Sequence, residues 1–149
     1  LLAEAYNNLG VIAIFENNYD AASELFKHAK KLGLNTNYNE GVVHINKGNY
    51  DKAVKLMTKD NPNCDYNVAL AMTLDKKYVI AEENVKCLEE NGKTLYLQVI
   101  IASRTKDVEK SLNHLAKAIN KDSKLKKTAK QDMEFAYMYD NPDFIALTE

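Results

Sequence analysis

The chain has 149 residues, of which 46% are hydrophobic and 28% charged, and its formal net charge is −1 at pH 7. These values are ordinary for one folded domain. The near-neutral charge gives no general attraction to nucleic acid or to an anionic membrane, and no apolar run approaches the roughly 18–20 residues of a membrane span. We therefore expect neither a nucleic-acid partner nor membrane insertion. Two prolines and five glycines in the whole chain favour helices joined by short loops.

The first thirty residues predict a pair of helices. In the first helix, one face contains Tyr6, Leu9, Gly10 and Ala13. In the second helix, which follows Asn17-Asn18, one face contains Tyr19, Ala22, Phe26 and Ala29. Small residues on both faces predict a hairpin in which the two helices approach closely. Asp20 suits the start of the second helix, and Gly33 suits the position just after its end.

The same pattern recurs along the chain. Gly10 is followed by Gly41, 31 residues later. Two further series keep the spacings 31, 28 and 30, namely Tyr19, Tyr50, Tyr78 and Val108, and Ala22, Ala53, Ala81 and Ser111. We predict four hairpins at about 3–33, 34–60, 62–91 and 92–122, the third beginning at Asn61-Pro62 as helix cap and first turn. Thr105 or Asp107 would cap the second helix of the fourth.

Residues 123–149 depart from the repeat. We expect short helices that cover the apolar face of the fourth hairpin, with a helix starting at Asn141-Pro142. The side chains expected to point inward are Leu125, Ala129, Met133, Phe135, Ala136, Met138, Phe144, Ile145 and Leu147.

These residues resemble the tetratricopeptide repeat, a family of helical hairpins. The first repeat matches it at Tyr6, Asn8, Leu9, Gly10, Tyr19, Ala22, Phe26 and Ala29. Later repeats depart from it, with Glu40 in place of leucine and Val99 in place of glycine, and the period is shorter than the usual value of about 34 residues. The resemblance implies an all-α, right-handed helical-hairpin solenoid with a C-terminal cap, forming a single domain over 1–149. Because Leu1 opens inside a helical pattern, we expect this domain to be part of a longer protein.

A second resemblance concerns the C-terminal third. Residues 101–105, 113–118, 125–135 and Phe144 are similar to the end of repeat arrays in large cell-envelope proteins of Gram-negative bacteria. This implies a periplasmic or outer-membrane-associated location, which the residues themselves leave open.

No pattern for catalysis or cofactor binding is present. The three histidines lie on different hairpins without metal-ligand spacing, and there is no glycine-rich phosphate loop. Cys64 and Cys87 form no C-x-x-C motif; two buried thiols are the favoured interpretation, with a disulfide as the alternative. We expect no enzyme activity, no metal and no cofactor.

The concave face, lined by the first helix of each hairpin, is the candidate binding surface for a protein or peptide. Tyrosines offer rigid area, and asparagine amides can hold the backbone of an extended peptide. Arg104, the one arginine among 20 basic residues, has a fork suited to a carboxylate. The candidate partner-binding residues are Asn7, Asn8, Tyr38, Asn39, Tyr66, Asn67, Tyr96 and Arg104.

Two alternatives stay open. The asparagines belong to the fold pattern itself and the tyrosines can pack against neighbouring helices, so the array could be an architectural spacer within a larger envelope protein. Oligomerisation through Leu1-Leu2 and an exposed apolar face of the first hairpin is another option, and the oligomeric state is undetermined. Nine Lys/Arg against three Asp/Glu between 104 and 130 are interpreted as a solvated surface, because the lysines scatter around the helices.

Overall fold

A computed structural model gives the fold and describes residues 1–59 and 64–149. Within these ranges the chain is helical and contains no strand, and the helices pack in neighbouring pairs, which confirms the all-α helical-hairpin fold class. The predicted helix start at Asn61-Pro62 lies outside the described residues. The chain divides into two compact units, Leu1–Lys77 and Tyr78–Glu149.

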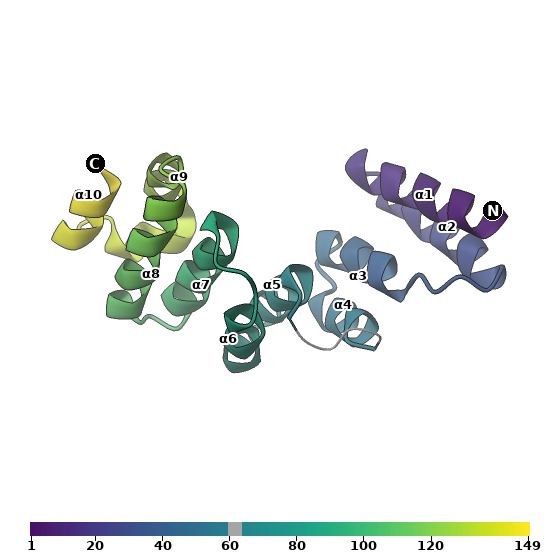
Figure 1. Ribbon diagram of the computed structural model, residues 1–149, viewed down its shortest axis with the longest axis horizontal. Helices are drawn as coiled ribbons and strands as arrows, with labels where there is room; N and C mark the ends of the chain where they lie inside the picture. The colour runs from purple at the N-terminus through teal and green to yellow at the C-terminus, as the bar shows by residue number, and fades with distance from the viewer. Residues whose placement is uncertain (60–63) are drawn as a thin grey trace. The chain divides into compact units, whose positions relative to one another are not determined.

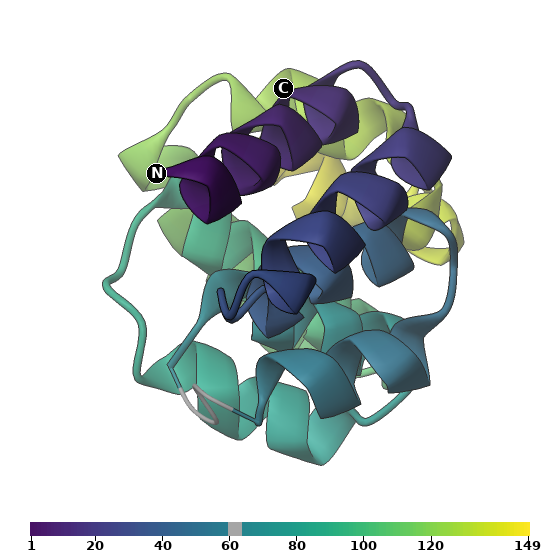
Figure 2. The same ribbon diagram turned by 90° about the vertical axis from the view of Figure 1, so that its right-hand side faces the viewer.

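In its described residues the first unit contains two complete hairpins and one further helix. The first hairpin pairs α1 (Leu2–Phe15) with α2 (Tyr19–Lys31), which lie side by side in both views (Figures 1 and 2). The second pairs α3 (Asn37–Asn46) with α4 (Tyr50–Met57), and α5 (Tyr66–Leu74) packs against α4.

Local signals set the ends of α2. The chain turns at Asn17, whose φ of 58° is one that asparagine tolerates, and the Asn18 side chain caps the helix by accepting a hydrogen bond from the backbone N–H of Ala21. At the other end Gly33 adopts φ 90°, and its N–H and that of Leu34 donate to the last helical carbonyls. The predicted role of Gly33 is thereby confirmed.

Glycine is required where each of the two hairpins is tightest. A Cβ built on Gly10 would lie 2.5 Å from Cε1 of Phe26, and one built on Gly41 would lie 2.2 Å from Cγ of Met57. Phe26 is fully buried, in a cluster with Ala13, Ala22 and Val43. The repeated glycine therefore marks a close helix-to-helix contact, as the sequence pattern indicated.

The second unit is built around α7 (Gly92–Arg104) and α8 (Val108–Lys121), with α6 (Tyr78–Lys86) packed on α7. Asn91 and Thr94 form a reciprocal capping box at the start of α7. Of the two caps considered for α8, Asp107 is the one used: its side chain accepts from the N–H of Lys110 at 3.0 Å.

Three short helices follow in the C-terminal cap, residues 123–149: α9 (Leu125–Gln131), the 3₁₀ helix η1 (Met133–Met138) and α10 (Pro142–Thr148). Asn141 caps α10 ahead of Pro142, as predicted. The cap closes a core cluster made of Val99, Leu115, Ala129, Phe135, Met138 and Phe144.

Three of the side chains predicted to point inward are exposed instead. Met133 is 77% exposed, Ala136 lies at the surface, and Ile145 is 40% exposed. In a 3₁₀ helix residues three apart share a face, so Phe135 and Met138 point inward together while Met133 and Ala136 share an outer face. The prediction assumed α-helical spacing and was wrong at these two positions for that reason. At Ile145, the inward face of α10 is taken by Phe144 and Thr148, four residues apart.

The prediction of two buried thiols was also wrong. Both Cys64 and Cys87 are disulfide-bonded, so neither is a free thiol, and both residues are exposed.

Among the helices that the structure describes, none combines the length and the hydrophobicity that a membrane span requires.

Candidate functional site

Three asparagines form what we call the amide row, Asn7 and Asn8 of α1 and Asn39 of α3. Asn39 donates from Nδ2 to Oδ1 of Asn7 at 2.7 Å, which ties the two helices together. Asn8 is exposed and makes no side-chain hydrogen bond within the described residues. One turn further along lie Val11 and Val42, both half-buried. The row is a polar strip beside a shallow apolar one.

Tyr38 is held inside the first unit. Its hydroxyl donates to the carboxylate of Asp65, 2.9 Å from Oδ2, and accepts from Nδ2 of Asn67 at 3.0 Å. Asp65 also caps α5 by accepting from the N–H of Val68. Burial raises the pKa of the Tyr38 phenol, which keeps it protonated and able to donate. Tyr38 and Asn67 thus connect α3 to α5.

Tyr66, at the start of α5, is half-buried, and burial raises the pKa of its phenol. Burial therefore keeps this hydroxyl uncharged to a higher pH than in an exposed tyrosine, and the side chain is partly covered by the fold.

In the second unit, Tyr96 and Arg104 of α7 are both engaged by the C-terminal cap. The hydroxyl of Tyr96 donates to Oδ2 of Asp132 at 2.8 Å. Nε of Arg104 donates to both carboxylate oxygens of Glu134, at 3.0 and 3.1 Å, and the terminal nitrogen donates to the same group. A bidentate pair of this geometry uses the fork of arginine fully. Arg104 already holds a carboxylate, and it comes from this chain.

An apolar stripe on α1 is exposed, as the sequence led us to expect. Leu2, Leu9 and Ile12 keep 61%, 51% and 52% of their surface accessible. Thirty-one residues later, Val43 occupies the position of Ile12 in α3 and is only 1% exposed. The equivalent face of the second hairpin is covered, and that of the first is not.

The three histidines lie on three different helices, α2, α3 and α8. In the described part of the chain no group of three or more His, Cys, Asp or Glu side chains lies close enough to hold an ion. Burial lowers the pKa of His44 and of His114, and the Nδ1 atom of each is buried with no hydrogen-bond partner among the described residues. Each of these two imidazoles is therefore more readily kept in its neutral form than an exposed histidine. His28 stacks on Tyr6 with ring centroids 5.2 Å apart.

Comparison with known families singles out the first two hairpins. Residues 3–32 and 34–59 match the family model for the tetratricopeptide repeat. Both segments carry the tetratricopeptide-repeat pattern. The matched ranges correspond to α1 with α2 and to α3 with α4, the hairpins whose contacts are closed by Gly10 and Gly41. Neither the comparison with curated proteins nor that with solved structures found a match.

Proposed function

We propose that this protein is a non-catalytic protein-interaction scaffold, and that its first unit binds an extended peptide or partner helix across α1, α3 and α5. Tetratricopeptide repeats generally mediate protein–protein interactions, and the family match lies in this unit. The observation that carries the proposal is the amide row, because it combines unused hydrogen-bonding groups with adjacent apolar surface.

The unused groups suit a peptide backbone. The Asn7–Asn39 bond uses one oxygen and one N–H, leaving the Nδ2 group of Asn7 and the oxygen of Asn39 without a partner among the described residues, while Asn8 keeps its whole amide. An extended peptide presents both N–H donors and carbonyl acceptors, and each amide can satisfy either kind. Val11, Val42 and the 82% exposed Phe15 add apolar area for its side chains.

A second candidate is an architectural spacer or assembly module within a larger cell-envelope protein, with no ligand of its own. It is favoured by the second unit, where the α7 side chains that were candidates for binding are joined to the chain's own cap through Tyr96–Asp132 and Arg104–Glu134. A surface saturated by its own chain has little capacity left for a peptide.

The test is a selection of random peptides displayed on phage against the protein, followed by calorimetry on the enriched sequences. The variant Asn8→Ala/Asn39→Ala removes the amide of Asn8 and the unused oxygen of Asn39, together with the bond from Asn39 to Asn7, and Asn120→Ala, an exposed asparagine on α8, is the control. Loss of two hydrogen bonds of about 1 kcal/mol each should weaken binding by roughly tenfold or more. Equal affinity for parent and double variant would move the site away from the amide row. Failure to enrich any peptide would favour the spacer.

A further inference from the structure

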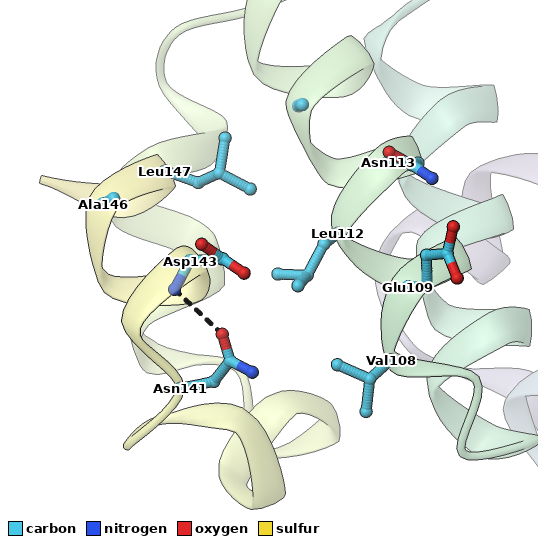
Figure 3. Close-up of a pocket in the computed structure, with 9 residues that line it drawn as sticks. Val108, Glu109, Leu112, Asn113, Asn141, Asp143, Ala146 and Leu147 are labelled. Carbon is cyan, nitrogen blue, oxygen red and sulfur yellow. Dashed lines mark hydrogen bonds between the residues drawn. The ribbon is translucent and has the colours of Figure 1, made fainter.

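The second unit contains an open groove between α8 and α10, with a volume of about 680 Å³ (Figure 3). Its α8 wall is formed by Val108, Leu112 and Ala116, spaced four residues apart on one helix face. Val108 and Leu112 point from α8 toward α10, and Leu147 points back from α10 (Figure 3). The volume lies in the range of about 300–1,000 Å³ typical of ligand sites.

The groove remains open because α10 is anchored elsewhere. Phe144 is buried against Phe135, with ring centroids 6.1 Å apart, and also contacts Tyr139. These contacts hold α10 to the 3₁₀ helix η1. On their buried sides α8 and α10 both pack on the core cluster, through Leu112 and Leu147, and the groove is the space left open outside this contact.

A comparable groove in the first unit is chemically different. It lies among α2, α3 and α4, with a volume of about 420 Å³, and charged side chains line most of it. Lys47 forms an ion pair with Asp20 at 2.6 Å inside it. The charged side chains that line this groove therefore compensate one another. The α8–α10 groove has an apolar floor instead, and no lysine or arginine is among its lining residues.

Two carboxylates lie beside the apolar floor, one on each helix. Asp143 on α10 extends its carboxylate toward Leu112, whereas Glu109 lies at the edge of the α8 wall, with its carboxylate turned away from α10 (Figure 3). Neither forms an ion pair within the described residues. An acidic residue in the first turn stabilises a helix by interacting with the positive end of the helix dipole, which accounts for the residue type. This helix effect does not explain why both carboxylates lie beside one apolar groove that has no lysine or arginine among its lining residues.

We propose that the α8–α10 groove binds a short amphipathic helix of a partner protein, with aliphatic side chains on the groove floor and a lysine or arginine at each acidic wall. The α8 stripe from Val108 to Ala116 is about 12 Å long, which matches two helical turns. Helices recognised in this way anchor through residues i, i+3, i+4 and i+7. This site is independent of the amide row and lies in the other unit.

The probe is an amidated, fluorescein-labelled helical peptide with four leucines at i, i+3, i+4 and i+7 spacing, flanked by lysines. Its anisotropy is followed on titration with the full chain. A second peptide carries glutamate in place of each lysine. We expect saturable binding of the lysine peptide, and affinity at least tenfold weaker for the glutamate peptide.

Three variants locate the binding. Glu109→Gln/Asp143→Asn removes the acidic walls and should weaken the lysine peptide about fivefold, as expected for two exposed pairs of up to 1 kcal/mol each. Ala116→Phe fills the floor without adding charge and should abolish binding. Asp20→Asn/Glu24→Gln removes two carboxylates from the first unit as the matched control and should change nothing. Circular dichroism of each variant verifies that it is folded.

The proposal is overturned if the lysine peptide binds Ala116→Phe as it binds the parent, if it binds Glu109→Gln/Asp143→Asn no more weakly than the control, or if it does not bind the parent. Asn8→Ala/Asn39→Ala must leave this affinity unchanged. The outcome therefore separates the fate of this groove from that of the amide row.

Discussion

Gly10→Ala tests the helix contact on which the first hairpin depends. The added methyl carbon would lie 2.5 Å from Cε1 and 2.8 Å from Cδ1 of Phe26, well inside van der Waals contact. Phe26 cannot move away freely, because it is fully buried against Ala22 and Val43. The two helices must therefore separate or the ring must leave its preferred rotamer.

Two opposing free-energy changes set the size of the effect. Alanine is preferred over glycine in a helix interior by about 1 kcal/mol, which stabilises the variant. Overpacking a well-filled core costs about 1–3 kcal/mol, and a contact this short belongs at the upper end. We expect the free energy of unfolding to fall by about 1–2 kcal/mol.

The assay is urea unfolding followed by circular dichroism, performed as a double-mutant cycle with Phe26→Leu. Leucine lacks the ring edge that Gly10 faces, so in that background Gly10→Ala should be neutral or stabilising. The coupling free energy between the two sites should be about 2 kcal/mol. If Gly10→Ala has the same effect in both backgrounds, Phe26 is not what requires glycine and the close-contact argument fails.

Three further predictions concern the second unit. Glu134→Gln removes the carboxylate that Arg104 holds and should lower the free energy of unfolding by about 1 kcal/mol in urea titrations, and an unchanged midpoint would contradict a role in fixing the cap. Burial, reinforced by the bond to Asp132, raises the pKa of Tyr96 above 10.0. Because the unfolded state then loses this proton first, the free energy of unfolding should fall as the pH rises past 10. In Tyr96→Phe this decline should be flatter. Burial lowers the pKa of His114 below 6.5. Because the unfolded state then gains a proton first, the free energy of unfolding should fall as the pH drops below 6.5. If the free energy of unfolding of His114→Gln depends on pH in the same way, this histidine is not the source of the effect.

The sequence predicted the first two hairpins because their determinants are local and repeated. A glycine facing a large residue of the partner helix recurs as Gly10 with Phe26 and Gly41 with Met57, and both pairs can be aligned without a structure. Helix ends could be predicted for the same reason. The helix start at Asn141-Pro142 is confirmed, and it was predictable because the hydrogen bonds of its cap extend only to residues 143 and 144.

The failures involve information that the local pattern does not contain. Whether residues 133–138 form an α-helix or a 3₁₀ helix depends on how Phe135 and Met138 pack into the core cluster, and that choice decided the exposure of Met133 and Ala136. The Arg104–Glu134 pair joins residues 30 apart through a turn whose path the sequence leaves open. A sequence shows that an arginine is available to bind a carboxylate, but it does not show which carboxylate.

The same distinction explains why the α8–α10 groove was missed. Its two walls come from α8 and α10, and neither wall is unusual by itself. A partial signal exists at Ala116, where the equivalent positions of the earlier hairpins are Lys27, Thr58 and Lys86, all polar. A polar residue in three repeats that is replaced by alanine in the fourth indicates that an apolar segment lies against this outward face. In the structure α10 lies near this face without filling it, which is why we assign the remaining space to a partner helix.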